Sequence, residues 1–260
     1  MIKLEHVVTA SPEQMEFIIE GMRNPMNSWK KSDSYTGFDC AACGKIKRDG
    51  SCSLGCPERE HCHDHYGFEL GENDHSLMQR LSNAGTDDRK FMRMMPVYVR
   101  ITAPLYWWKE FDTYKVGTVA NSCSTMHKIA AKEFDISDFS NEHLILEPLT
   151  GVNRIPSKFG PEQEFQTSGY STLQAIRDVL NHYRALYLES RNKYYWWQLI
   201  QLLPSSYNQT RNVMLNYEVL ANIYKSRKNH KLDEWREFCK WIETLPYSEI
   251  ITGNVQAVNE

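Results

Sequence analysis

Several features that would place a chain of 260 residues in a functional class at once are missing. No apolar run of about 18 residues occurs, which argues against a membrane-spanning helix. The formal net charge is −3, so there is no basic surplus for binding bulk nucleic acid. The opening residues MIKLEHVVTASPEQ contain no apolar signal segment, which predicts a cytoplasmic protein. A chain of this length can bury a core in one large domain or two small ones, and we expect a single domain over residues 1–260.

The cysteines, in contrast, are strongly clustered. Five of the seven lie between positions 40 and 62, and three histidines lie at the end of this stretch or just after it: Cys40, Cys43, Cys52, Cys56, Cys62, His61, His63 and His65. A C-x-x-C spacing lets two thiolates from one tight turn reach the same metal ion. The stretch is also rich in glycine and other turn residues, and it is too polar to bury a core of its own. A bound metal would supply the missing cross-link.

Several interpretations of this cluster stay open. Structural zinc fits best, because four cysteines at short spacing make a closed tetrahedral site with no open position for water: Cys40, Cys43, Cys52 and Cys56. A set of three cysteines and one histidine, including Cys62, is a variant of it. An iron–sulfur cluster uses the same thiolates, whereas disulfides need an oxidising compartment. A cysteine-rich loop that binds nothing is the remaining possibility.

The pattern of apolar residues predicts a mixed α/β (α+β) chain, with a modest sheet and long helices. Strands are expected at 3–8 and at 89–102, with Pro96 at an edge or bulge. Ser11 and Pro12 are typical of a helix start. Further helices are expected at 72–84, 104–115, 172–203, 213–224 and 233–243. Residues 31–66, which contain the cysteines, are expected to be a metal-binding loop.

Two stretches resemble the flavin-dependent thymidylate synthases, the ThyX family. Residues 101–118 read ITAPLYWWKEFDTYKVGT, where the family has a strand and a helix that lead into R-H-R-x-x-S-x-N-E-x-S-x-R. Residues 202–210 read LLPSSYNQT, where the family pattern is close to V-L-P-x-S-x-Y-T. The family continues with N-x-R-x-L-x-x-F-x-x-x-R, and the spacing from Pro204 to Asn216 to Arg227 agrees without a gap. The cysteine loop at 31–66 lies outside these stretches, so the resemblance implies that it is an insertion.

The departures from the family pattern concern mainly charged residues. Without gaps, the R-H-R triplet becomes Thr113-Tyr114-Lys115, and the next motif positions hold Asn121 for glutamate, Cys123 for serine and Thr125 for arginine. A shift of one residue keeps Asn121 and Ser124 but places Met126 at the arginine. Glu218 stands at a further arginine position. Because arginine forks hold phosphates in a bidentate manner, these losses predict weaker binding of dUMP.

The resemblance implies an enzyme that methylates C5 of dUMP. FAD would supply the hydride, NADPH would reduce the flavin, and methylenetetrahydrofolate would donate the carbon. The resemblance also implies a homotetramer and a small-molecule nucleotide substrate. Carried over by position, cofactor contacts fall on Tyr114, Lys115, Thr118, Asn216 and Asn222. Substrate contacts fall on Lys115, Asn121, Ser124 and Arg227.

Ser124 and Cys123 are the candidate catalytic residues. Cys123 has two interpretations: a thiolate that attacks C6 of a pyrimidine, or a small buried thiol with a packing role. Two other functions compete with C5 methylation. One keeps the fold but changes the nucleotide or the carbon donor, as in C5 hydroxymethylation. The other is a protein without catalysis, whose zinc loop binds a partner.

Overall fold

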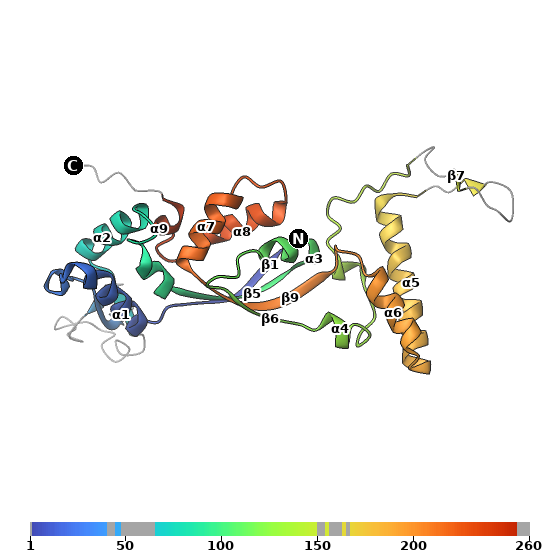
Figure 1. The fold of residues 1–260 in the computed structure, drawn as a ribbon, viewed down its shortest axis with the longest axis horizontal. Coiled ribbons are helices and arrows are strands. Elements are labelled where there is room, and N and C mark those ends of the chain that lie inside the picture. Colours follow the sequence, from blue (N-terminus) through green and yellow to red (C-terminus); the bar gives the residue numbers. More distant parts are fainter. Residues whose placement is uncertain are drawn as a thin grey trace. The chain divides into compact units, whose positions relative to one another are not determined.

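The computed structural model describes residues 2–40, 45–47, 66–149, 154–155, 163–164 and 167–253 (Figure 1). Two compact units contain them. The first unit comprises Met1–Lys3, Ile101–Thr113 and Asn121–Arg211, and the second comprises Leu4–Arg100, Tyr114–Ala120 and Asn212–Glu260. Helices and strands are both well represented, as the apolar pattern predicts. The expectation of one domain over residues 1–260 stays a prediction.

The larger sheet has four strands in the order β1-β5-β9-β6, namely Lys3–Thr9, Pro96–Pro104, Asn208–Asn216 and Val119–Ser122. The strand predicted at 3–8 is confirmed as β1. The strand predicted at 89–102 begins later, because Lys90–Met94 form a 3-10 helix, η4. Pro96 is the first residue of β5, a position where a missing N–H is tolerated. The prediction of an edge strand there is wrong, since β5 lies inside the sheet.

In the second unit, α7 (Tyr217–Arg227) packs on η4, α8 (Asp233–Glu243) and α9 (Glu249–Thr252). The helix predicted at 233–243 is confirmed as α8. Its apolar side is fully buried at Trp235, Phe238 and Ile242. Two further helices are α1 (Pro12–Arg23), with a capping box at Ser11, and α2 (Glu72–Asn83). The first residues of the segment predicted as a helix at 213–224 belong to β9 instead.

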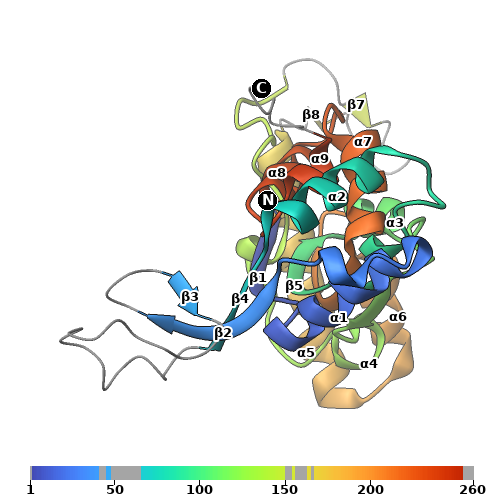
Figure 2. The ribbon, with the colours of Figure 1, turned by 90° about the vertical axis from the view of Figure 1, so that its left-hand side faces the viewer.

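A second, antiparallel sheet has the order β3-β2-β4, with strands Lys45–Lys47, Tyr35–Cys40 and Tyr66–Glu69 (Figure 2). Cys40 ends β2, and its backbone is paired with that of Lys45. The sequence predicts an inserted loop over residues 31–66, but its two described ends are strands. The rest of the insertion lies outside the described residues, as do Cys43, Cys52, Cys56, Cys62, the nearby histidines and the Cys40 side chain.

A buried ion pair anchors the start of this sheet to α1 and α2. The Asp74 carboxylate is fully buried and accepts a hydrogen bond from Arg23 Nε at 2.5 Å. Its other oxygen accepts bonds from the backbone and side chain of Ser34 at 2.9 and 2.7 Å, and from Ser32 Oγ at 2.8 Å. Asp33 accepts bonds from the first backbone N–H groups of α2. One carboxylate therefore joins two helices to the segment that enters β2.

The first unit is built on a helical hairpin. Its helices α5 (Gly169–Ser190) and α6 (Lys193–Leu202) lie side by side (Figure 1). The sequence predicts one helix over 172–203, whereas Arg191 adopts a left-handed conformation (φ +54°) and reverses the chain. The hairpin shares a core with the segment after β6: Ile129, Ala130, Phe134, Phe139, Leu173, Leu180 and Leu199.

The other elements of the first unit are short. They are α3 (Leu105–Phe111), α4 (Thr125–Lys128) and the paired strands β7 (Arg154–Ile155) and β8 (Gln163–Glu164). The Trp107 and Trp108 rings of α3 are buried. Among the helices that the structure describes, none is long and apolar enough to cross a membrane.

We predict that Asp74→Asn lowers the free energy of unfolding by about 3–5 kcal/mol, because it leaves the buried Arg23 guanidinium without its counter-charge. Urea denaturation measures this loss. Asp87→Asn is the control, since the Asp87 side chain is 93% exposed and should change stability by less than about 0.5 kcal/mol. A loss below about 1 kcal/mol for Asp74→Asn would show that Arg23 finds another partner.

The pH dependence of this loss has a definite sign. Burial alone raises the pKa of Asp74, but hydrogen bonds from Ser34, Ser32 and Arg23 outweigh it and hold the pKa below its ordinary value. A carboxyl whose pKa is lower in the folded state adds stability above its unfolded pKa of about 3.9, and loses it as the pH falls through the folded pKa. The stability gap between wild type and Asp74→Asn should therefore be constant above about pH 5 and narrow in acid.

Candidate functional site

A tight turn in the second unit holds two of the predicted cofactor residues. Residues 115–118 form the turn, and Thr118 donates its backbone N–H to the Lys115 carbonyl at 3.4 Å. Gly117 has φ +79°, a conformation that other L-residues rarely adopt. A Cβ at this position would lie 2.8 Å from Asn216 Nδ2 and 3.1 Å from Val219. Only glycine therefore lets the turn approach the start of α7 so closely.

Asn216 connects β9 to α7. Its side-chain oxygen accepts a hydrogen bond from the Val219 backbone N–H at 3.0 Å, so Asn216 is the N-cap of the helix. Its amide nitrogen faces the Gly117 turn. The structure thus brings the predicted residues Lys115, Thr118 and Asn216 together, although about 100 positions separate the turn from the helix.

The Thr118 hydroxyl has a special status in this turn. Its Oγ1 atom is buried and has no hydrogen-bond partner among the described residues. A buried hydroxyl without a partner costs about 1–3 kcal/mol, so such a group calls for an explanation. A ligand oxygen or nitrogen that reaches the turn would satisfy it. Lys115, two residues earlier in the turn than Gly117, is exposed.

Tyr114 and Arg227 are also brought together, by an aromatic contact. Arg227 Nε donates a hydrogen bond to the Tyr114 hydroxyl at 3.0 Å, and the guanidinium lies over the Trp235 ring, 4.9 Å from its centroid. The Tyr114 and Trp235 rings meet edge to face, with centroids 6.0 Å apart. The sequence predicts Arg227 as a substrate contact. The structure shows that its guanidinium is already oriented by two aromatic side chains, with its side chain half-buried.

Glu218, at an arginine position of the resemblance, does not present a free negative charge. Arg93 binds both of its oxygens, with Nε and with an Nη at 3.3 Å. Arg89 Nε lies 3.4 Å from the same carboxylate, close enough for an ion pair but not aligned for a hydrogen bond. Hydrogen bonding to Arg93 is the main cause that holds the pKa of Glu218 below its ordinary value. The carboxylate is thus ionised and neutralised at neutral pH.

Asn222 lies on the same face of α7, one turn after Glu218. Its side-chain oxygen accepts a hydrogen bond from Arg89 at 3.1 Å. Sequence reasoning missed Arg89 and Arg93, because each lies more than 120 positions before its partner on α7. No local motif signals such a pairing, and only the fold brings η4 against the first turns of this helix.

The first unit holds the remaining predicted residues, Asn121, Cys123 and Ser124. Asn121 is an exposed residue of β6. The backbone of Cys123 is fixed at both ends, since its N–H donates to the Thr210 carbonyl at 2.9 Å and its carbonyl accepts from Gln209 at 3.0 Å. The expectation of a buried thiol is wrong, because Cys123 is exposed.

Ser124 follows directly and caps the short helix α4. Its Oγ accepts a hydrogen bond from the His127 backbone N–H at 3.0 Å. A hydroxyl that accepts in this way keeps its own O–H available as a donor. Cys123 and Ser124 therefore present a thiol and a hydroxyl side by side on an exposed segment of the first unit.

The side chains of the predicted metal site lie outside the described residues. Within the described ranges, no three Cys, His, Asp or Glu side chains are grouped so that they could hold a metal ion. The four predicted ligands have side chains outside those ranges. Structural zinc therefore stays a prediction.

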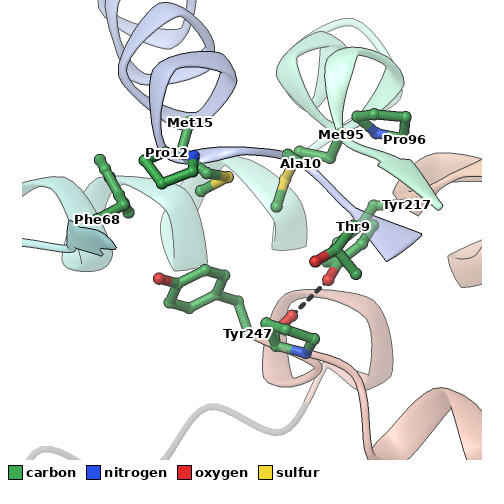
Figure 3. Close-up of a pocket in the computed structure, with 10 residues that line it drawn as sticks. Thr9, Ala10, Pro12, Met15, Phe68, Met95, Pro96, Tyr217 and Tyr247 are labelled. Atoms are coloured by element: carbon green, nitrogen blue, oxygen red, sulfur yellow. Dashed lines mark hydrogen bonds between the residues drawn. The ribbon is translucent and has the colours of Figure 1, made fainter. Parts of the chain in front are cut away.

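A cavity of about 180 Å³ lies in the second unit, between the start of α1 and the segment that joins α8 to α9 (Figure 3). Met15 and Met95 line it together with the Tyr217 and Tyr247 rings. The Tyr217 hydroxyl donates to the Pro246 carbonyl at 2.5 Å, and burial raises its pKa. None of the predicted site residues lines this cavity, although Tyr217 directly follows Asn216 in the chain.

Comparison with known proteins gives one consistent result. No family model and no curated protein sequence matches the chain. Solved structures do. Two crystal structures of thymidylate synthase X (ThyX) from Helicobacter pylori, each described as a complex with FAD and dUMP, match with a TM-score of 0.55. They share 14% and 15% sequence identity with it; 97% of this chain is covered in both, and 96% and 97% of theirs.

A third match is PolB from Streptomyces cacaoi, described as a UMP/dUMP methylase bound with 5-Br dUMP. It has a TM-score of 0.52 and 11% identity, covering 96% of this chain and 94% of PolB. At such low identity the likeness concerns the fold alone, and it extends over nearly the whole chain. The fold predicted from the two motif stretches is thus confirmed, and this chain has a ThyX-like fold.

Proposed function

We propose that this chain is a flavin-dependent enzyme that methylates C5 of a pyrimidine nucleotide. The observation that carries the proposal is the fold, because nearly the whole chain matches proteins described as bound to FAD and dUMP or as UMP/dUMP methylases. dUMP is the proposed substrate and methylenetetrahydrofolate the proposed carbon donor, with NADPH as reductant. The PolB match favours UMP as a second candidate substrate.

The residues of the second unit fit a bound flavin nucleotide. An unpartnered buried hydroxyl at Thr118 and a backbone that only glycine can bring against Asn216 are features of a surface shaped to receive a ligand. Tyr114, Lys115, Thr118, Asn216 and Asn222 are the proposed cofactor contacts. When bound, FAD supplies the hydride for the reaction. The role of these protein groups is to position it and to balance its phosphate charge.

The proposed substrate contacts combine cations with neutral donors. Lys115 is exposed and Arg227 is oriented by Tyr114 and Trp235, so both can offer N–H donors to a phosphate. Asn121 and Ser124 can hydrogen-bond to a pyrimidine edge, and the backbone bonds of Cys123 fix the segment that carries Ser124. We propose that Ser124 orients the substrate at the reacting carbon. Cys123, the exposed residue before Ser124, is the candidate for a covalent nucleophile.

We also propose a homo-oligomer, a tetramer as the resemblance implies. Support comes from an apolar groove of about 500 Å³ in the first unit, lined by Ala175, Ile176, Val179 and Leu202 with three hydroxyl residues. Other large apolar side chains of this unit are exposed by about half or more: Ile145 at 57%, Leu146 at 67% and Leu149 at 49%. Exposed apolar side chains gathered on one unit favour a protein interface.

The function is tested on the purified protein. We predict that it takes up FAD, with the absorbance of bound flavin, and converts dUMP to the C5-methylated nucleotide when methylenetetrahydrofolate and NADPH are present. Native mass spectrometry of the same sample should show a tetramer. Cys123→Ser should retain turnover within about threefold if no covalent bond to the enzyme forms. A colourless protein that takes up no FAD and is not stabilised by dUMP would contradict the proposal and favour the non-catalytic alternative.

The Thr118 hydroxyl gives a test with two opposite signs. We predict that Thr118→Val raises the free energy of unfolding of the ligand-free protein by about 1 kcal/mol, because a buried group without a partner is removed. FAD affinity should fall about fivefold, because the ligand loses a hydrogen bond. Denaturation and flavin-fluorescence titration measure the two effects.

Thr102→Val is the matched control. The Thr102 hydroxyl is hydrogen-bonded to that of Thr210 at 2.7 Å, so its removal should destabilise the protein by about 1 kcal/mol and leave FAD affinity unchanged. If Thr118→Val destabilised the protein, or bound FAD as tightly as wild type does, the interpretation of this hydroxyl as a ligand contact would be wrong.

We further propose structural zinc at Cys40, Cys43, Cys52 and Cys56. Cys40 ends β2 and pairs with Lys45, so only four residues, Cys43 among them, connect the paired positions. Elemental analysis should give one zinc per chain, lost in Cys40→Ser and Cys43→Ser but retained in Cys239→Ser, whose thiol is buried in the second unit. Iron with visible absorbance would indicate an iron–sulfur cluster instead, and a metal-free protein would exclude both.

A further inference from the structure

The strongest charge cluster beside the proposed cofactor surface is centred on Glu218, in the first turn of α7. We call Arg89, Arg93, Glu218 and Asn222 the Glu218 cluster. Its two guanidinium groups face a single carboxylate, so the cluster carries a net charge of +1. Two acidic side chains lie nearby: Asp87 is within ion-pair distance of Lys90, at 3.9 Å, and its charge also contributes, after the hydrogen bond to Glu218, to raising the pKa of Arg93, while Asp88 accepts the backbone N–H of Gly85.

Burial within this cluster is graded from the inside outward. The Glu218 side chain is 9% exposed and Arg89 is 19% exposed, whereas Arg93 is 52% exposed. Arg93 uses Nε and one Nη to bind Glu218; its other Nη has no hydrogen bond within the described part of the chain. The buried Glu218 carboxylate thus fixes one side of the Arg93 guanidinium, and the remaining N–H donors of that guanidinium face solvent.

The position of the cluster is as informative as its charge. Glu218 and Asn222 are four residues apart and share one face of α7, and Arg89 contacts both. Asn216, two residues before Glu218, caps the helix and contacts the Gly117 turn. The exposed guanidinium of Arg93 is therefore attached to a helix turn that lies between two proposed cofactor contacts, Asn216 and Asn222.

We propose that Arg93, held on Glu218, is the cation that binds a phosphate group of the nucleotide cofactor at this end of α7. This inference rests on the proposed function. The resemblance places an arginine at position 218, where this chain has a glutamate. The structure supplies a guanidinium to the same place from η4, 125 positions earlier. Glu218 is then a positioning residue, and the cationic character of the site is kept although its sequence signature is lost.

The competing interpretation is that the ion pairs only fasten η4 to α7. A fastening role predicts that loss of Arg93 lowers thermal stability and leaves ligand affinity and its salt dependence unchanged. A phosphate contact predicts that loss of Arg93 lowers ligand affinity and changes thermal stability little, because half of the Arg93 side chain is solvated and adds little to folding. A guanidinium–phosphate contact is also weakened by salt, since the charges are exposed before binding.

The experiment compares wild type with Arg93→Gln and Arg93→Lys. Two probes are titrated: FAD, followed by flavin fluorescence, and inorganic pyrophosphate, followed by the shift in melting temperature. We expect Arg93→Gln to weaken FAD binding at least tenfold, to flatten its dependence on salt and to abolish stabilisation by pyrophosphate. Arg93→Lys should fall between the two, since it keeps the charge but loses the planar fork. Lys90→Gln, on the same 3-10 helix, is the control and should behave as wild type.

The outcomes separate this inference from the proposed function. If wild type binds FAD and Arg93→Gln binds it equally well, the inference is overturned and the flavin function stands. If wild type does not bind FAD, the flavin function fails, and the pyrophosphate titration still decides: stabilisation that Arg93→Gln removes supports the phosphate site, and no stabilisation of wild type overturns it. Circular dichroism confirms that the variants are folded.

Discussion

The close contact between the Gly117 turn and Asn216 is the constraint on which the candidate site depends. Asn216 ends β9, begins α7 and supports the turn with a single amide side chain. Without that cap, the helix would lose a hydrogen bond at its first turn and the residues on it would lose their fixed direction. Glu218, Asn222 and Arg227 all belong to this helix. Every proposed contact on α7 therefore depends on the Asn216 cap for its position.

Much of the fold could be predicted where the signals were local. Ser11 and Pro12 begin α1 as expected, and the amphipathic pattern at 233–243 gives α8 its exact bounds. The failures also have physical causes. Arg191 breaks a continuous helical pattern by adopting φ +54°, which the periodicity of its neighbours does not reveal. At 213–216, apolar residues at alternate positions belong to a strand, because Val213 and Leu215 are buried in β9.

For the candidate site, spacing was a better guide than residue identity. Tyr114 is predicted from a motif position that has lost its family residue and Arg227 from one that keeps it, and the structure brings the two into contact. Glu218 was read as a loss of positive charge, because its partners on η4 are invisible to any local pattern. An ion pair formed across more than 100 positions is a property of the fold. A motif position that lacks its cation in the sequence can therefore have a cation placed beside it by a residue distant along the chain.

The Asp74 network has a further consequence for how this chain is organised. Ser34 and Gly71, the residues that flank the β2–β4 sheet, are held together, since the Gly71 N–H donates to Ser34 Oγ at 3.0 Å while Ser34 itself is bound to Asp74. Because this junction already holds the two ends of the intervening segment together, closing that segment costs little further chain entropy. The junction at Asp74 therefore brings the first residue of β2 beside the last residue of β4, where Tyr35 is paired with Glu69, and so sets the register of the two strands from outside the sheet.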